Sequence, residues 1–160
     1  MSAALPEGTT AEQVKSCCAD FYASDWAGLL LGESFHPGGT RLTDRLADLL
    51  QLGRDSRVLD VAAGRGGSAI HLAQRRGCRV IGVDLSAANV DAATANARAD
   101  AVDDLVTFVV GDAESLGIDN GDFDAVICEC ALCTFPDKAQ AARGFARVLR
   151  PGGRVGISEL

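Results

Sequence analysis

The sequence predicts a doubly wound α/β fold, in which helices cover both faces of a parallel sheet. From Arg57 onward, short apolar runs alternate with segments of helical periodicity, which is typical of βαβ units. The first apolar run leads directly into a glycine-rich turn and then into a helix. A chain of 160 residues, of which 48% are hydrophobic, is long enough to form one domain with a buried core.

Three helical segments are predicted ahead of the first strand. Thr9 and Glu12 fit a capping box, which indicates that a helix begins there. A second, short helix is followed by a Pro-Gly-Gly loop and by a third helix whose leucines share one face and which Gly53 ends. These helices cover about residues 10–22, 26–31 and 40–52. We expect residues 1–53 to form a helical cap, or lid, on a core made by residues 54–160.

Five strands and three intervening helices are predicted after these segments. The strands are 57–61, 79–83, 105–110, 123–130 and 153–159, and the helices are 66–76, 86–99 and 137–149. Right-handed connections between parallel strands place the helices on both faces of the sheet. Ligands of such sheets bind beyond the carboxyl ends of the strands, so a functional site is expected there.

Composition and charge argue against several classes of function. The formal net charge of −7 disfavours nonspecific binding to nucleic acids or anionic membranes. No apolar run approaches the roughly 20 residues that a membrane-spanning helix needs, and the N-terminus lacks the features of a secretion signal. We therefore expect a cytoplasmic protein without nucleic-acid or membrane partners, whose six cysteines are reduced thiols.

The glycine-rich turn after the first predicted strand is the main candidate binding feature. Gly64 and Gly66 lack a Cβ, so a ligand can approach the backbone closely, and the N-terminus of the next helix faces the same point. Asp84 ends the second predicted strand, where an acid can accept hydrogen bonds from ribose hydroxyls. Residues 64–69 also satisfy the dinucleotide pattern G-x-G-x-x-A, so this turn alone leaves a nicotinamide cofactor open.

Three further features bear on the choice between the two cofactors. Asp60, inside the end of the first strand, can anchor the turn or receive an ammonium group. After the third strand, Asp112 can accept from an adenine amino group while the Ala113 N–H points at a ring nitrogen. A Pro-Gly-Gly turn at 151–153 precedes the last strand.

In these segments the chain resembles the class I S-adenosylmethionine-dependent methyltransferases. The similarity lies in five segments that follow the order and spacing of the family, namely 58–66, 82–86, 111–114, 123–126 and 145–153. The nearest likeness is to the small-molecule branch that includes the ubiquinone-biosynthesis and arsenite methyltransferases. The resemblance implies methyl transfer from S-adenosyl-L-methionine to a small-molecule acceptor. We expect a Rossmann-like methyltransferase fold with five strands in the order 3-2-1-4-5.

The resemblance also implies which residues contact the cofactor. They are Asp60, Ala62, Gly64, Gly66, Asp84, Leu85, Asp112, Ala113 and Cys128. The glycine loop is expected at the methionine end, the tip of the second strand at the ribose and adenine, and the end of the third strand at the adenine edge. The tip of the fourth strand, near Cys128, is expected to face the sulfonium.

The chain departs from the family pattern at two points. Ala62 stands where the loop usually has its first glycine, and its small methyl group is expected to be tolerated. The family continues with two more strands after the fifth, so we expect the chain to be truncated there. The strand at 153–159 would then be a sheet edge through which a second copy can pair to form a homodimer.

Cysteines and one histidine are candidate substrate ligands. Cys128 and Cys130 are two apart on the predicted fourth strand, so they are expected on one face, with Cys133 in the next loop. Glu129 can act as a base, but the alternation of a strand would turn it away from both cysteines. Thiolates there would suit a thiol or a thiophilic metalloid such as arsenite, and packing as small apolar residues is the alternative. His36, before the first strand, is the remaining substrate candidate, and no metal site is predicted.

Two other functions stay open on the sequence alone. One is an NAD(P)-dependent oxidoreductase that uses the turn at 64–69. The other is a truncated domain that binds a cofactor, metal or metalloid without catalysis. Asp60, Asp112 and the turn at 151–153 favour the methyltransferase over the oxidoreductase.

Overall fold

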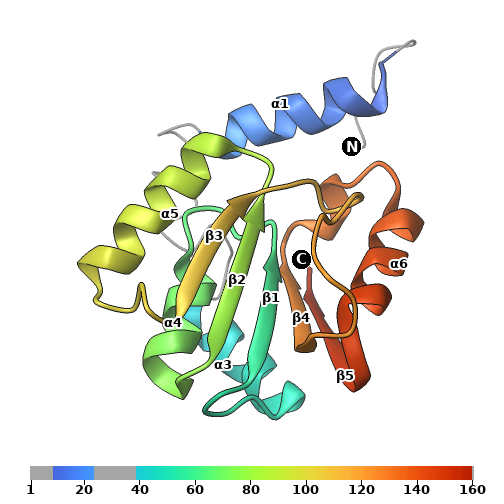
Figure 1. The fold of residues 1–160 in the computed structure, drawn as a ribbon. Coiled ribbons are helices and arrows are strands. Elements are labelled where there is room, and N and C mark those ends of the chain that lie inside the picture. Colours follow the sequence, from blue (N-terminus) through green and yellow to red (C-terminus); the bar gives the residue numbers. More distant parts are fainter. Residues whose placement is uncertain (1–8, 24–38, 160) are drawn as a thin grey trace.

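A five-stranded parallel sheet forms the centre of the molecule (Figure 1). The structure is a computed structural model that describes residues 9–23 and 39–159. The strands are β1 (Arg57–Val61), β2 (Arg79–Asp84), β3 (Val106–Val110), β4 (Phe123–Glu129) and β5 (Leu149–Ser158). Their spatial order is β3-β2-β1-β4-β5 and every pairing is parallel. The predicted fold class and strand order are therefore confirmed.

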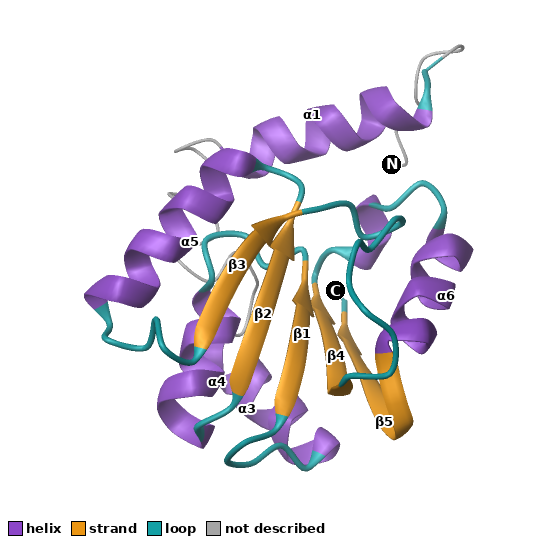
Figure 2. Ribbon diagram, viewed as in Figure 1, coloured by secondary structure: helices purple, strands orange, loops and turns teal. Residues whose placement is uncertain are grey.

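Helices cover both faces of the sheet and the edge formed by its carboxyl ends (Figure 2). They are α1 (Ala11–Ala23), α3 (Gly39–Leu50), α4 (Gly67–Arg76), α5 (Ala87–Ala99), the short 3-10 helix η1 (Leu132–Thr134) and α6 (Lys138–Val148). Helices α3, α4 and α5 pack on one face, α6 packs on the other, and α1 crosses the carboxyl edge. The short helix predicted at 26–31 and the candidate His36 lie outside the described residues.

Strand β1 shows how the two faces of the sheet divide the core. Val58 packs in the cluster with α3, α4 and α5, whereas Leu59 and Val61 pack in the cluster with α6, and all three are fully buried. This alternation follows from the two-residue repeat of a strand, and burial on both faces explains the continuous apolar run. Asp60 interrupts that run with a buried carboxyl group, which marks it as a functional candidate.

The end of α3 differs from the sequence prediction. The helix ends at Leu50, and Gln51 adopts a left-handed conformation with φ 58°. The N–H of Leu52 donates to the carbonyl of Ala47, and the N–H of Gln51 to that of Asp48, which is a Schellman motif. Burial of Leu52 fixes this ending, so Gly53 lies beyond the cap and does not end the helix.

The predicted Pro-Gly-Gly turn lies within β5 instead of before it. The strand pairs with β4 at Leu149, opposite Phe123, and again at Arg154, opposite Ala125, with a shift of register between the two pairs. Gly152, with φ 82°, lies in the residues that bulge out at this shift. Strand β5 therefore begins directly after α6.

Gly66, directly before α4, and Gly82, in β2, make room for one aromatic ring. A Cβ on Gly82 would lie 2.4 Å from Cδ1 of Phe108, and one on Gly66 would lie 2.5 Å from its Cζ. Phe108 is itself buried on β3. The absence of side chains at these glycines therefore lets the ring pack against the sheet and the glycine loop.

We predict that Gly82→Ala lowers the free energy of unfolding by about 1–3 kcal/mol, because the new methyl overpacks the ring of Phe108. Urea denaturation measures the change. Gly53→Ala is the matched control, since a Cβ there meets nothing within 4 Å. Phe108→Leu should recover part of the loss when it is combined with Gly82→Ala. Equal stability of Gly82→Ala and the wild type would contradict this account of the packing.

Candidate active site

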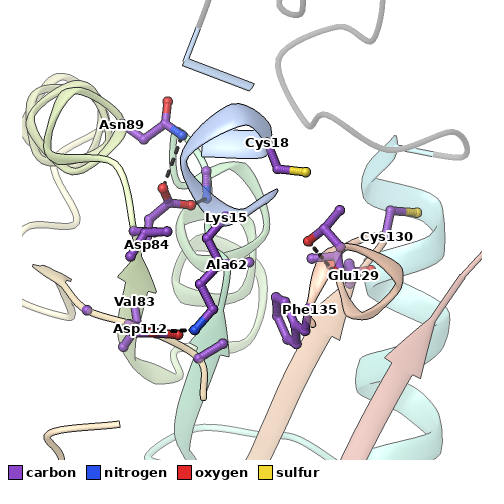
Figure 3. A pocket seen from close by; sticks show the side chains of 16 residues that line it. Lys15, Cys18, Ala62, Val83, Asp84, Asn89, Asp112, Glu129, Cys130 and Phe135 are labelled. Atoms are coloured by element: carbon purple, nitrogen blue, oxygen red, sulfur yellow. Dashed lines mark hydrogen bonds and ion pairs between the residues drawn. The ribbon is translucent and has the colours of Figure 1, made fainter. Parts of the chain in front are cut away.

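A pocket lies at the carboxyl ends of the strands, beneath α1 (Figure 3). The empty space inside it and at its mouth is about 820 Å³. It brings together seven of the predicted site residues, namely Ala62, Gly64, Asp84, Leu85, Asp112, Ala113 and Cys130. They follow four different strands, and they meet because the carboxyl ends of parallel strands share one edge of the sheet.

Asp84 connects the glycine loop to the tip of β2. One carboxylate oxygen accepts the backbone N–H of Gly64 at 2.8 Å. The other accepts the backbone N–H of Ser86 at 2.9 Å and the side-chain amide of Asn89 at 3.1 Å. Asn89, a buried pocket residue in the first turn of α5, was not predicted from the sequence. These bonds hold the Asp84 carboxylate rigidly beside the loop.

Asp112 is bound from the opposite direction by the N-terminal helix. Its Oδ2 lies 2.7 Å from Nζ of Lys15, and Nζ lies 2.5 Å from Oε2 of Glu114. Burial acts to lower the pKa of Lys15, but its hydrogen bonds to the two carboxylates together outweigh burial and raise it. Lys15 is 97 positions from Asp112, so no local pattern in the sequence indicates this contact. The ion pairs dock α1 on the pocket.

Asp60 is a buried acid with an incomplete set of hydrogen bonds. The side chain is 2% exposed, the backbone N–H of Ala69 donates to its carboxyl group, and Oδ2 has no hydrogen-bond partner. Burial, followed by the negative charges of Glu129 and Asp84, raises the pKa of Asp60 well above its usual range. Asp60 is therefore poised to receive a cationic or proton-donating group.

Glu129 reaches the pocket from the last position of β4. Its Oε2 accepts from the hydroxyl of Ser68 at 2.5 Å and from that of Thr43 at 3.1 Å. Thr43 and Ser68 are both buried and their hydroxyl oxygens are 3.3 Å apart. Glu129 does turn away from Cys128, as expected from strand alternation, and this direction places it in the pocket.

Comparison with known proteins agrees with this geometry. A family model described as "Methyltransferase domain" matches residues 59–157, which include the glycine loop and the carboxyl ends of β1 to β4. The chain belongs to this methyltransferase family. Solved methyltransferases with a similar structure contain S-adenosyl-L-homocysteine or sinefungin, so the family implies S-adenosyl-L-methionine as the cofactor. The fold of the domain is the Rossmann-like methyltransferase fold.

Three proteins illustrate the similarity. The domain is 36% identical over 148 residues to 27-O-demethylrifamycin SV methyltransferase from Amycolatopsis mediterranei, an alignment that covers 85% of this chain and 54% of that protein. The [4+2]-cyclase SpnF has a TM-score of 0.84 at 27% identity, with 98% of this chain and 63% of SpnF covered. Geranyl diphosphate C-methyltransferase from Streptomyces coelicolor, solved with S-adenosyl-L-homocysteine, has a TM-score of 0.68 at 28% identity, covering 97% and 53%. The chain therefore spans about half to two thirds of the length of these relatives.

The structure of the methyltransferase domain corrects the prediction for Cys128. Its side chain is fully buried in the cluster with α6, and burial raises the pKa of its thiol far above the usual range. The prediction assumed that the strand continues through Cys130. Instead β4 ends at Glu129, and Cys130 adopts a left-handed conformation with φ 52°. Glu129 and Cys130 therefore line the pocket where Cys128 was expected.

The other thiols near the strand ends differ in whether they line the pocket. Cys133 is exposed in η1 and is not among the pocket-lining residues, whereas Cys18 of α1 lines the pocket together with Cys130. Burial raises the pKa of both Cys18 and Cys130. Within residues 9–23 and 39–159, no group of three or more His, Cys, Asp or Glu side chains has the arrangement of a metal site.

The two glycines of the loop have different roles. Gly64, with φ 56°, lines the pocket, whereas Gly66 is buried against Phe108 and its missing Cβ serves packing. Ala62, with φ 61°, takes up the left-handed conformation that a glycine adopts at lower cost. Ala62 packs against the cluster with α6 and also lines the pocket.

We predict that Lys15→Met loosens α1, because the helix loses its ion pairs with Asp112 and Glu114. Hydrogen exchange of residues 11–23 should accelerate about fivefold, equivalent to ~1 kcal/mol for a part-buried ion pair. Ser16→Ala, at the exposed neighbouring position, is the control and should leave the exchange unchanged. Unaltered exchange in Lys15→Met would show that other contacts hold the helix.

Proposed function

We propose that the protein transfers a methyl group from S-adenosyl-L-methionine to a small-molecule acceptor. The observation that carries this proposal is the convergence of Asp84, Asp112 and the glycine loop on one pocket within a methyltransferase domain. When bound, the cofactor supplies a methyl group that already has a good leaving group. The chain's own residues then have to bind the cofactor, orient the acceptor in line and exclude water.

We assign each part of the pocket to one part of the cofactor. The carboxylate of Asp84 is proposed to accept from the ribose hydroxyls, with Leu85 against the adenine. Asp112 and the backbone of Ala113 are proposed to recognise the adenine edge. The loop at 62–64, with Asp60 beneath it, is proposed to hold the methionine part. Each assignment rests on a polar group at the pocket or directly behind it.

The first turn of α4 argues against the dinucleotide alternative. In dinucleotide-binding folds, the helix after the glycine loop binds the pyrophosphate through its N-terminus. Here Ser68 donates its hydroxyl to Glu129, and Ala69 donates its N–H to Asp60. A pyrophosphate next to two protein carboxyl groups would be repelled, whereas a ligand with a cationic end is attracted. This arrangement supports S-adenosyl-L-methionine over NAD.

We also propose, more narrowly, that the acceptor is a thiol or a thiophilic metalloid such as arsenite. The protein would then belong to the small-molecule branch that includes the arsenite and ubiquinone-biosynthesis methyltransferases. Its support is that Cys18 of α1 and Cys130 after β4 line the same pocket. The raised pKa values keep these thiols protonated at neutral pH, so a soft ligand would have to displace the protons. Cys133, which is exposed in η1, and His36, which lies outside the described residues, stay predicted substrate residues.

The remaining proposals concern the whole protein. The lid at 1–53 and core at 54–160 are proposed as the functional units, and further strands beyond β5 are proposed to complete the acceptor site, because the relatives are longer. Without these further strands, the domain would bind its cofactor but would not catalyse methyl transfer.

The exposed Val155 and Ile157 on the edge strand β5 support a homodimer. We also propose a cytoplasmic protein without nucleic-acid partners, given the charge of −7. Among the described helices, none is long and apolar enough to cross a membrane.

Calorimetry with S-adenosylhomocysteine and with NAD tests the proposed function. We expect micromolar binding of S-adenosylhomocysteine and no binding of NAD. Asp112→Ala should weaken binding about tenfold, which corresponds to a lost hydrogen bond to a charged acceptor at ~1.4 kcal/mol. Asp119→Ala, an exposed acid in the loop after β3, should have no effect. Binding of NAD without binding of S-adenosylhomocysteine would overturn the proposal.

Titration with arsenite or phenylarsine oxide tests the thiophilic acceptor. If Cys18 and Cys130 bind the metalloid, Cys130→Ser should weaken binding at least tenfold, and Cys78→Ser should leave it unchanged because Cys78 is buried in the core. Wild-type protein that fails to bind, or a Cys130→Ser variant that binds normally, would remove arsenite from the list of acceptors.

A further inference from the structure

Two thiols in the segment after β4 are separated by two residues. Cys130 follows directly on Glu129, the last residue of β4, and Cys133 lies in η1. This spacing is the C-x-x-C pattern, which is typical of dithiols that are oxidised and reduced as a pair. Neither cofactor binding nor methyl transfer requires such a spacing, so the pair calls for an explanation of its own.

The turn between the two cysteines has the curvature that a disulfide needs. The separation of two Cα atoms three residues apart depends on the dihedral angles of the residues between them, here Ala131 and Leu132. Ala131 has ψ −26° and Leu132 begins the 3-10 helix, so both residues curl the chain. The N–H of Thr134 donates to the carbonyl of Ala131 at 2.9 Å, which fixes the turn. A 3-10 turn advances roughly 6 Å over three residues, within the range of about 4.4–6.8 Å between the Cα atoms of a disulfide.

Both thiols of the pair are accessible, whereas the third thiol of this segment is not. Cys133 is exposed and Cys130 is partly exposed, but Cys128 is fully buried in the cluster with α6. The charge of Cys133 acts on the pKa of Cys130, which agrees with their closeness along the turn. Cys18, which Figure 3 shows on α1, lines the same pocket as Cys130 and is the competing partner.

Glu159, which follows β5, stabilises the reduced form of the turn. Its carboxylate accepts the N–H of Leu132 at 2.8 Å and the thiol of Cys133. Burial and this hydrogen bond raise the pKa of Cys133, because a carboxylate favours the thiol over the thiolate. The thiolate is the form that attacks a disulfide, so Glu159 slows oxidation without covering the sulfur atom.

A bond between the two cysteines would change the wall of the pocket. Cys130 lines the pocket together with Glu129 and Ala131, whereas Cys133 is not among the lining residues. A disulfide to Cys133 would therefore turn the side chain of Cys130 away from the pocket. Oxidation of an exposed pair would in this way reach the binding site.

We propose that Cys130 and Cys133 form a disulfide by exchange with a small-molecule disulfide such as glutathione disulfide, and that this bond weakens ligand binding in the pocket. The thiolate of Cys133 attacks one sulfur of the small molecule and the other half leaves as a thiol. The thiolate of Cys130 then attacks the sulfur of Cys133 and releases the second half. Two cysteine thiols are thereby oxidised, one small disulfide is reduced to two thiols, and the two protons pass to the leaving groups. The inference goes beyond the proposed function, since the disulfide forms whether or not a ligand binds.

Mass spectrometry of protein treated with excess glutathione disulfide tests the pairing. In the wild type, the tryptic peptide that contains residues 128–133 should lose two hydrogen atoms, and Cys128 should still be alkylated after denaturation. In Cys130→Ser, the reaction should stop at a glutathione adduct on Cys133, because the resolving thiol is missing. Cys18→Ser is the control and should form the disulfide as the wild type does.

Glu159→Gln tests the first step. Glutamine still accepts the N–H of Leu132 but removes the charge that favours the protonated thiol of Cys133. Alkylation of Cys133 by iodoacetamide near neutral pH, measured in the Cys130→Ser background, should accelerate about threefold. An unchanged rate would show that Glu159 does not control the thiol.

Calorimetry with S-adenosylhomocysteine compares the reduced and the oxidised wild type. The oxidised form should bind about threefold more weakly, and the ligand should by linkage favour the reduced pair by the same factor. Equal affinities of the two forms would overturn the effect on the pocket. Pairing of Cys130 with Cys18 or Cys128, or a stable glutathione adduct on Cys133 of the wild type, would overturn the disulfide itself. If neither form binds S-adenosylhomocysteine, the proposed function fails, whereas the result of the mass spectrometry stands.

Discussion

The hydrogen bond from the backbone of Gly64 to the carboxylate of Asp84 is the contact on which the pocket depends. It joins the loop after β1 to the tip of β2 across the two strands whose ends form the floor of the site. The loop contains left-handed residues at Ala62, Gly64 and Gly66, and such residues keep their conformation only where the surroundings determine it. Since a carboxylate has about four acceptor sites, Asp84 can hold the loop and still accept from a ligand.

The same loop directs the N-terminus of α4 toward the site. The groups that bind this N-terminus determine which kind of ligand fits there. A free helix N-terminus would bind a phosphate group, but this one is occupied by carboxyl groups of the protein. Burial raises the pKa of Asp60, and the adjacent Glu129 and Asp84 raise it further. A positive group of a ligand would favour the charged form of the Asp60 carboxyl group. The fold thus shares its architecture with dinucleotide-binding proteins while favouring a different ligand.

The strands and their order were predictable, because each lies in a continuous apolar run separated by helical periodicity, and parallel connections leave few arrangements. The residues directly after the first three strands were also predictable as site residues, since they follow from strand ends alone. The residues that line the pocket at the end of β4 were not predictable. The left-handed residue Cys130 stops the strand alternation, so Glu129 lines the pocket where Cys128 was expected. Lys15 was missed because its partners lie 97 or more positions away.

Docking of α1 brings a basic side chain to one end of the pocket. Lys15 offsets part of the negative charge of Asp112 and Glu114 at the proposed adenine end of the pocket. At the other end, Glu129 accepts from the hydroxyls of Ser68 and Thr43, and Asp60 accepts the backbone N–H of Ala69. Helix α1 thus contributes the side chains of Lys15 and Cys18 to the pocket, although it precedes the α/β core in the sequence.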